Sequence, residues 1–388
     1  MDTPTTRAPL PPLTLRPVQT ARELRQFVTF PARLYRGDPH WVAPLIDDQV
    51  HLLDPAGNPY WRTARRALWL AWRGGRPVGG IAAIVDAARM RALGQAQGAF
   101  GFFECEDDLE AARALVAAAA DWRRAAGCTS LIGPYNPTPD EMPGILVDGF
   151  DTRPALLEGH HPPYYAALLE AAGLRRDHDL VARLFRAPPE ARTLAEVLPA
   201  KLQRAAELAE RRLDLRVRPL NFSAWDAEIA LATRLFNESL ADLPGFAPMA
   251  EATFRELAQA FRPILDPDLA HVAEIAGRPA GFALALPDFN EALQAARGRL
   301  WPLGFLRVWW RSRRLRRCTV KMLMILPAYQ GRGVEAVLGV HLARAIWARG
   351  YREVDCSLMG DENVKSNRLQ EHLGLAVSRR YRLYTQEL

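Results

Sequence analysis

The strongest constraint on the fold is an internal repeat, in which the same order of six elements occurs twice. The segments "RPVGGIAAIVD" (76–86) and "RPAGFALALPD" (278–288) both match the second strand of a hairpin. They are followed by the apolar strands "GAFGFFEC" (98–105) and "CTVKMLMIL" (318–326). In each copy a helix with a glycine C-cap, a further strand, a short helix and a terminal strand come next. Strands that alternate with helices predict an α/β fold with mixed sheets.

The two copies differ by one insertion. Gly127 and Gly350 are 223 residues apart and Gly173 and Gly374 are 201 apart, so the first copy holds 22 extra residues. This segment, "TPDEMPGILVDGFDTRPALLEG", is rich in Pro, Gly and Asp and predicts an ordered loop. The sequence therefore predicts a disordered Pro-rich lead over 1–14, a first lobe over 15–190, a linker helix over 191–214 and a second lobe over 215–388.

Composition excludes several classes of protein. Apolar residues make up 49% and charged residues 24% of the 388 residues, without a run of 18 apolar residues, so we expect no integral membrane association. The four cysteines form no CxxC pair, which argues against a zinc site, and the N-terminus lacks a signal-peptide pattern. We therefore expect a cytoplasmic protein, and the sequence leaves its oligomeric state open.

The net charge of +6 is carried almost entirely by arginine. Only Lys201, Lys321 and Lys365 are lysines among the 50 basic residues, a ratio that indicates a GC-rich coding sequence. A surface built for nucleic acid usually mixes the two residue types, so RNA is not expected as a partner from charge alone.

The turn "QGRG" (330–333) separates a predicted strand from a predicted helix. The first N–H groups of a helix have no partner within the helix, and glycine lets the backbone approach an anion closely. The helix that follows has one apolar face, on which His341 is expected as a core histidine. This turn matches neither the Walker A loop nor a dinucleotide-binding motif, because GK[ST] and GxGxxG are both absent.

Two motifs resemble the GNAT acyltransferases. The segment "YQGRGV" (329–334) is similar to their pyrophosphate loop, Arg/Gln-x-x-Gly-x-Gly/Ala, and "NVKSNRLQEHLGL" (363–375) is similar to their Asn-x-x-Ala-x-x-Leu-Tyr-Glu-Lys-x-Gly-Phe block. The motifs cover residues 215–388, and the whole chain resembles two-lobed bacterial GNAT-like proteins. The duplicated layout is also similar to the Fem-type aminoacyltransferases.

This resemblance implies a tandem GNAT-like fold, with two mixed central sheets flanked by helices. It also implies an N-acyltransferase that moves an acetyl or longer acyl group from acyl-CoA to an amine, on a small molecule or a peptide, held between the lobes. No metal is implied. The residues implied to bind acyl-CoA are Ile325, Gln330, Gly331, Arg332, Gly333, Val334 and Asn363.

The sequence departs from the family pattern at two positions. Glu335 stands where the loop has its second Gly or Ala, and a carboxylate there competes with a phosphate for the helix N-terminus. Gln370 stands where many GNAT enzymes have a tyrosine that protonates the leaving thiolate. Ser357, Tyr381 and Tyr384 are candidates for that role, and the alternative for each tyrosine is a half-buried strand residue with its hydroxyl at the surface.

Other stretches leave alternatives open. The first lobe has "FFECEDDLEAARALV" at the matching turn, so we expect Asp107 or Asp108 to cap a helix and no cofactor to bind there. The segment "WWRSRRLRR" (309–317) is typical of an amphipathic element with a tryptophan-bearing buried side, or of a site for RNA, anionic lipid or an acidic ligand. Two rival functions follow: a Fem-like transferase that uses charged tRNA, and a ligand-binding or scaffold protein without catalysis.

Overall fold

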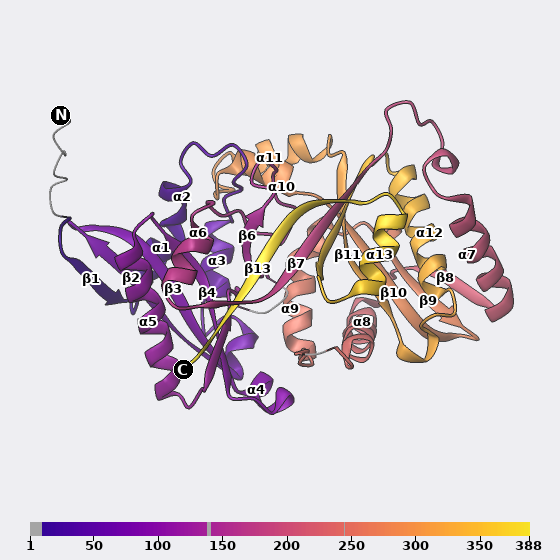
Figure 1. Ribbon diagram of the computed structural model, residues 1–388. Helices are drawn as coiled ribbons and strands as arrows, with labels where there is room; N and C mark the ends of the chain where they lie inside the picture. The colour runs from indigo at the N-terminus through magenta and orange to yellow at the C-terminus, as the bar shows by residue number, and fades with distance from the viewer. Residues whose placement is uncertain (1–9, 138–140, 244) are drawn as a thin grey trace, which may run out of the picture.

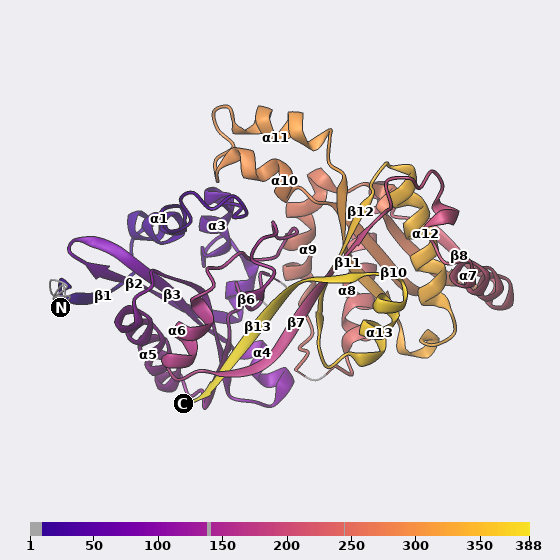
Figure 2. The same cartoon turned by 45° about the horizontal axis from the view of Figure 1, so that its top comes forward.

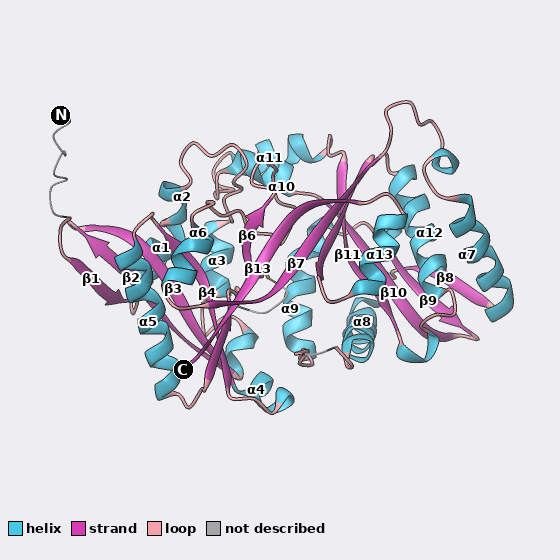
Figure 3. Cartoon of the chain, in the orientation of Figure 1, coloured by secondary structure: helices cyan, strands magenta, loops and turns pink. Residues whose placement is uncertain are grey.

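The structure is a computed structural model and describes residues 10–137, 141–243 and 245–388. Within these residues the strands form one mixed thirteen-stranded sheet, and helices cover both of its faces (Figures 1 and 3). The predicted α/β class is therefore confirmed. The two sheets expected for the two lobes are joined edge to edge by hydrogen bonds into one.

The first half of the chain contains seven strands, β1 (Leu13–Pro17), β2 (Ala64–Arg73), β3 (Arg76–Asp86), β4 (Gln97–Cys105), β5 (Ser130–Gly133), β6 (Ile145–Asp148) and β7 (Arg175–Arg186). Its described α-helices are α1 (Ala21–Thr29), α2 (Pro31–Leu34), α3 (Ile46–Leu52), α4 (Ala87–Leu93), α5 (Leu109–Ala125) and α6 (Tyr165–Ala171).

The second half contains the strands β8 (Leu215–Pro219), β9 (Ala270–Ile275), β10 (Arg278–Pro287), β11 (Arg317–Ile325), β12 (Glu353–Gly360) and β13 (Ala376–Glu387). Its described α-helices are α7 (Ala200–Leu213), α8 (Trp225–Leu240), α9 (Glu251–Phe261), α10 (Asn290–Leu293), α11 (Gly304–Ser312), α12 (Val334–Ala348) and α13 (Val364–His372). Short 3₁₀ turns lie at Pro59–Arg62, Leu194–Glu196, Phe222–Ala224, Arg262–Ile264, Pro267–Leu269, Gln294–Ala296 and Pro327–Tyr329.

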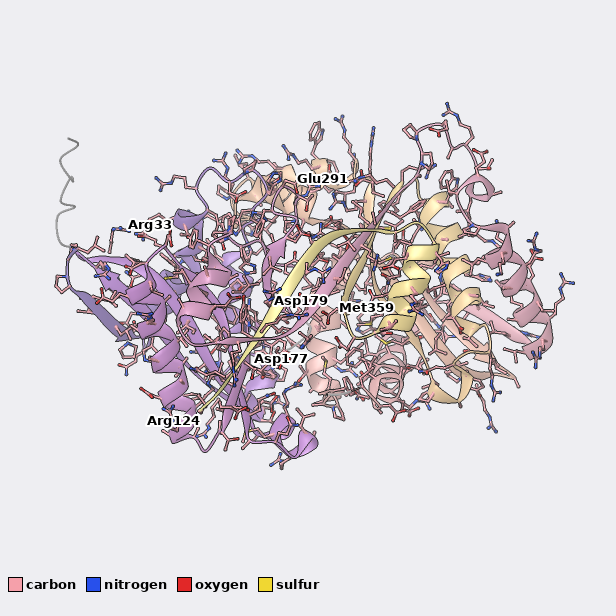
Figure 4. All side chains as sticks on the ribbon, in the orientation of Figure 1. Arg33, Arg124, Asp177, Asp179, Glu291 and Met359 are labelled. Carbon is pink, nitrogen blue, oxygen red and sulfur yellow. The ribbon has the colours of Figure 1, made fainter. Side chains whose placement is uncertain are left out.

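The two halves exchange their last strands. The strand order is β1-β2-β3-β4-β5-β13-β7-β12-β11-β10-β9-β8, with β6 paired to β13. The C-terminal strand β13 thus lies against β5 of the first half, while β7 lies against β12 of the second. Figures 1 and 2 show β7 and β13 running side by side through the centre, and Asp179 of β7 is labelled there in Figure 4.

Each half has helices on both faces of its strands. In β3 a Cβ on Gly79 would lie 2.8 Å from Leu115 of α5, and a Cβ on Gly80 would lie 3.0 Å from Phe27 of α1. Neighbouring residues of a strand point to opposite faces, so α5 and α1 cover opposite faces of the sheet. In the second half α12 packs on one face of β10 and α8 packs in the apolar cluster that contains Phe282 on the other.

Some boundaries differ from the sequence-based expectations. β1 begins at Leu13, inside the stretch expected to be disordered, and Leu13 pairs with Arg73 of β2. Residues 1–9 of that stretch lie outside the described part of the chain. The predicted linker helix, α7, buries Ala206 and Ala209 in the same apolar cluster as α12, so it packs as part of the second half. The division into lobes stays a prediction.

Two details of the sequence reading are decided by the structure. Asp108 is the N-cap of α5, and its side chain accepts a hydrogen bond from the N–H of Ala111 at 3.0 Å, as expected. The alternative of a tryptophan-bearing buried side for 309–317 is wrong, because Trp309 and Trp310 are both exposed. α11 packs against α10 and the 3₁₀ turn at Gln294–Ala296, and both tryptophans lie outside this contact.

The exchanged strand gives a first prediction. Leu383 of β13 is fully buried against Ile132 and Tyr135 of the first half, so Leu383→Ala leaves a cavity there. We expect the free energy of unfolding in urea to fall by about 2 to 5 kcal/mol. Val377→Ala, at an exposed position of the same strand, is the control and should change it by less than about 0.5 kcal/mol.

Because each half contains a strand of the other, fluorescence and circular dichroism should report one common transition. The strand exchange would be contradicted by two separate unfolding transitions, if Leu383→Ala shifted only the transition of the second half.

Candidate active site

The strands β11 and β12 separate in the middle of the sheet. They run parallel and are paired only as far as Val320 and Cys356. Beyond that point β11 continues to Ile325 beside β10, and β12 continues toward Gly360 along β7. Lys321 is the first residue of β11 after the separation. The two strands therefore diverge just before the glycine turn that follows β11.

The predicted phosphate turn lies between β11 and the N-terminus of α12. Gly331 and Gly333 have φ angles of +69° and +94°, which favour glycine. Gly333 is the N-cap of α12, and a Cβ there would lie 2.8 Å from the Cβ of Ala209 on α7. Nothing lies within 4 Å of a Cβ placed on Gly331, so this side of the turn is open. The turn thus has the backbone conformation and the space that an anion site needs.

Three side chains lie in or next to this turn. The side chain of Glu335 is half-buried, and its Oε2 atom has no hydrogen-bond partner among the described residues, so that oxygen does not occupy the N–H groups of the turn. Gln330 donates its side-chain N–H to the carbonyl oxygen of Ile325 at 3.2 Å. Arg332 is exposed.

Asn363 caps a different helix. Its side-chain oxygen accepts a hydrogen bond from the N–H of Ser366 at 3.3 Å at the start of α13, and its carbonyl oxygen accepts one from Asn367. The predicted role of Asn363 in binding acyl-CoA stays a prediction, as does that of the turn.

A buried cluster of charged groups lies where the two halves meet. Arg379 of β13 is fully buried, and its guanidinium lies 2.7 Å from Oε2 of Glu158 and 2.5 Å from Oδ2 of Asp355. Glu158 belongs to the loop before α6 in the first half, and Asp355 belongs to β12. We call Glu158, Lys321, Asp355 and Arg379 the central charged cluster.

The sheet leaves room for Arg379 to reach across it. β7 lies between β13 and β12, and its residues Ala182 and Leu184 pair with Arg379 and Asp355 respectively. Paired residues share a face of the sheet. The methyl side chain of Ala182 leaves space for the guanidinium to cross β7 and meet the carboxylate of Asp355.

Burial and charge give the two carboxylates different pKa values. Burial raises the pKa of Asp355 to about 7, helped by the charge of Glu158 and opposed by Arg379 and Lys321. Burial acts in the same direction on Glu158, but Arg379 and Lys321 outweigh it and hold its pKa below the usual value. Burial lowers the pKa of Lys321, against the nearby carboxylates. At neutral pH Glu158 is therefore ionised while Asp355 exchanges a proton.

Two oxygens of the cluster are available to a ligand. Oε1 of Glu158 and Oδ1 of Asp355 are buried without a hydrogen-bond partner among the described residues. Buried polar atoms nearly always have such a partner. A donor such as an amine or a hydroxyl group would satisfy both oxygens.

An apolar pocket meets the cluster at Lys321. It is lined by Leu157, Leu220, Trp225, Glu228, Ile229, Ala232, Phe254, Leu257, Ala258, Phe261, Leu265, Phe282, Leu284, Leu286, Lys321 and Met322. Its cavity volume is about 70 Å³, so it is a narrow seam between the helices α8 and α9 and the sheet. Two charged residues line this apolar seam. Glu228 forms an ion pair with Arg218, with Nη1 of Arg218 2.6 Å from Oε1 of Glu228, whereas Lys321 belongs to the central charged cluster.

The predicted catalytic residues lie in different places. Tyr381 lies beside the central charged cluster and donates a hydrogen bond from its hydroxyl to the carbonyl oxygen of Gly159 at 2.9 Å, and burial holds its pKa far above the usual value. Tyr384 lies elsewhere, with its hydroxyl 3.2 Å from Oε1 of Glu170 on α6. Ser357 lies on β12, but its side chain is outside the described part of the chain. The catalytic roles of these three residues stay predictions.

The sequence reading missed Glu158, Lys321, Asp355 and Arg379 as a group. A signal was present for two of them. Lys321 is one of three lysines in the chain and interrupts the apolar strand "CTVKMLMIL", and Asp355 interrupts "EVDCSLMG". A charge inside an apolar strand implies a buried partner. The partners come from distant segments, which the strand exchange brings together.

The segment "HHPPYY" (160–165), which precedes and begins α6, is held by contacts inside the first half. Nε2 of His160 lies 3.0 Å from Oδ2 of Asp38, and the hydroxyl of Tyr165 donates to Oε2 of Glu104 at 2.7 Å. Among the described residues, no group of His, Cys, Asp and Glu side chains is arranged to hold a metal ion.

Solved structures with a similar fold include a tandem GNAT protein and a GCN5-related N-acetyltransferase. A tandem GNAT protein from the clavulanic acid biosynthesis pathway has a TM-score of 0.56 at 14% identity, and the match covers 97% of this chain and 98% of that one. A GCN5-related N-acetyltransferase from Sphaerobacter thermophilus has a TM-score of 0.53 at 13% identity, covering 97% and 95%. The predicted resemblance to two-lobed GNAT proteins is confirmed at the level of the fold.

Two relatives match almost the whole chain in sequence. The bacterial ceramide synthase of Caulobacter vibrioides (strain NA1000 / CB15N) is 32% identical over 383 residues, 97% of this chain and 98% of that protein. Protein YghO of Escherichia coli (strain K12) is 29% identical over 375 residues, 94% and 93% of the two chains. No family model matches. The chain belongs to the family of the Caulobacter bacterial ceramide synthase.

The raised pKa of Asp355 gives a second prediction. The pKa of Asp355 is about 7 in the folded protein, compared with 3.8 for an exposed aspartic acid. Its protonation therefore contributes most to the free energy of unfolding below about pH 4. That contribution is lost as the pH rises through the pKa of the folded protein. Relative to Asp355→Asn, the wild-type free energy of unfolding should therefore fall between about pH 4 and pH 7.

The measurement is urea unfolding of both proteins at a series of pH values. Asn keeps an oxygen for Arg379 but does not titrate. A difference between the two proteins that stays constant over this range would contradict the raised pKa.

Proposed function

We propose that this protein transfers a long acyl group from acyl-CoA to the amine of a long-chain amino alcohol. The observation that carries the proposal is that Lys321 of the central charged cluster lines the apolar seam. The apolar seam could bind an alkyl chain, and a carboxylate of the cluster next to it could accept a proton. A ceramide is the amide of a fatty acid and such an amino alcohol, and the relative at 32% identity carries the name ceramide synthase.

The turn at residues 330–334 is the proposed site of the pyrophosphate of acyl-CoA. Its glycines have the required positive φ angles, it opens at the N-terminus of α12, and the exposed Arg332 adds a positive charge. The thioester would then lie along β11 toward the point where β11 and β12 diverge, near Ile325 and Lys321.

The reaction forms a C–N bond and an S–H bond and breaks a C–S bond and an N–H bond. The amine nitrogen attacks the thioester carbonyl carbon, the C–N bond forms and the C–S bond breaks. One proton leaves the nitrogen, and the thiolate of CoA takes one proton from solvent. Amide and free CoA are the products, without an oxidant or a reductant.

Asp355 is the proposed proton acceptor. Its pKa of about 7 suits an exchange of protons at neutral pH, and its Oδ1 has no hydrogen-bond partner among the described residues. Arg379 holds Asp355 and Glu158 in place as a positioning residue. The ionised Glu158 would accept a hydrogen bond from the same amine or from a hydroxyl group of the amino alcohol.

Incubation of the purified protein with palmitoyl-CoA and sphinganine tests the proposal. Mass spectrometry should detect N-palmitoylsphinganine, and a thiol assay should detect free CoA in equal amount. Binding of CoA without product from either long-chain or short-chain amines would favour a ligand-binding protein. Transfer from an aminoacyl-tRNA instead would favour the Fem-like function.

The phosphate turn gives a third prediction. Arg332→Glu places a negative charge at the proposed pyrophosphate site, and we expect calorimetry to show a loss of CoA affinity of about tenfold or more. Arg344→Glu, at an exposed position further along α12, is the matched control with the same change in net charge. Equal affinity in both variants and the wild type would place the cofactor elsewhere.

The apolar seam gives a fourth prediction. Ala232 lies on α8 in its wall, so Ala232→Phe narrows it. Each buried methylene contributes about 0.8 kcal/mol, and we expect the preference in kcat/KM for a 16-carbon over an 8-carbon amino alcohol to fall about tenfold or more.

Leu208→Phe, at an exposed position of α7, is the control for the added aromatic ring. An unchanged preference in Ala232→Phe, with normal folding, would mean that the chain of the acceptor lies outside the seam.

A further inference from the structure

An insert between β10 and β11 stands away from the sheet. The chain leaves the sheet at Pro287 and returns at Cys318, which pairs with Pro287. Between them lie α10, a 3₁₀ turn and α11. Figure 2 shows α11 at the outer edge of the molecule, above α10, and Figure 4 labels Glu291 of α10 on the same edge.

The insert exposes large apolar side chains. Gly304 of α11 is buried, and Val308 and Ser312 follow at helical spacing on the half-buried side that faces α10. The exposed fractions of the others are 78% for Trp301, 56% for Leu303, 42% for Phe305, 48% for Leu306, 54% for Trp309 and 53% for Trp310. Six such side chains on one short segment form an apolar surface of the size that marks an interaction site.

The same segment is strongly basic. Residues 297–317 contain the eight arginines Arg297, Arg299, Arg307, Arg311, Arg313, Arg314, Arg316 and Arg317, and the sequence has no acidic residue between Glu291 and Glu335. The guanidinium of Arg313 lies 3.8 Å from the ring centroid of Trp309, and that of Arg314 lies 4.3 Å from that of Trp310. Aromatic and positive groups therefore share one surface.

We propose that α11 and the turn before it, residues 301–314, dock the protein on an anionic lipid bilayer. Apolar side chains that enter the boundary between headgroups and acyl chains, beside arginines that bind lipid phosphates, are the features of an interfacial helix. α11 has nine residues and is far too short to span a bilayer. In the described part of the chain, no helix is long and apolar enough to do so.

Two other occupants fit the surface less well. RNA binds arginines and stacks on aromatic rings, but it offers nothing for Leu303 and Leu306, which are exposed together with the rings. A second copy of the chain would bring two arginine-rich segments face to face around a twofold axis. The repulsion between them would oppose that contact, whereas an anionic bilayer matches both the charge and the apolar groups.

The insert is tied to the segment that carries Glu158. Asn290 of α10 donates to the carbonyl oxygens of Pro154 and Ala155 at 3.1 and 2.8 Å. Gln294, after α10, donates to the carbonyl oxygen of Pro39 at 2.6 Å. Docking through α11 would therefore hold the central charged cluster at a fixed place relative to the bilayer.

Flotation of the full chain with vesicles tests this inference without any activity. Vesicles of phosphatidylcholine with 30 mol% phosphatidylglycerol are the probe, and vesicles of phosphatidylcholine alone are the comparison. We expect binding to the anionic vesicles that weakens at high salt. Arg311→Gln/Arg313→Gln/Arg314→Gln should weaken it about a hundredfold, because each arginine near such a surface contributes about fivefold.

A second variant separates the apolar contribution from the charge. Trp309→Ser/Trp310→Ser leaves every arginine in place and should also weaken vesicle binding at least about tenfold. Leu208→Ser/Arg212→Gln, at exposed positions of α7, is the matched control and should bind as the wild type does. Circular dichroism checks that all variants are folded.

The proposal would be overturned if the protein does not float with anionic vesicles, or if all variants float equally. Binding of a single-stranded RNA that both α11 variants abolish, without binding of vesicles, would also overturn it and would identify RNA as the partner. Because the readout is flotation, failure of docking and failure of acyl transfer are observed separately.

Discussion

The fully buried guanidinium of Arg379 is the interaction on which the rest of the structure depends. It stands on the C-terminal strand, and its two carboxylate partners come from the loop of the first half and from β12 of the second. Removal of one member of such a buried group leaves an uncompensated charge, which destabilises a protein strongly. The strand exchange and the central charged cluster therefore depend on each other. The position of β13 places Arg379 between the two carboxylates, and these ion pairs in turn hold β13 in the sheet.

Much of the fold follows from the repeat in the sequence. The strand predicted at 76–86 is β3 with the same bounds, the linker helix is α7 and the acidic turn of the first half is capped by Asp108, because apolar periodicity and capping act over short distances. The strand exchange could not be predicted in this way. β13 has the alternating pattern that suits either half, and only long-range pairing decides which strand it joins.

The same distinction applies to the candidate site. The glycine turn was predicted because two glycines and a helix N-terminus are adjacent in the sequence. The cluster was missed because its members lie at least 24 residues apart in sequence, and the loop with Glu158 belongs to the insertion that distinguishes the first copy. That insertion supplies the carboxylate of Glu158 to the central charged cluster, and in this way the first copy takes part in the candidate site.

The pH dependence of acyl transfer tests the central claim, that Asp355 accepts the proton, most directly. We predict that kcat/KM of the wild type for palmitoyl-CoA and sphinganine falls below about pH 7, and that the residual activity of Asp355→Asn lacks this acidic limb. The same acidic limb in Asp355→Asn, with the same midpoint, would contradict the assignment and would place the proton acceptor outside the central charged cluster.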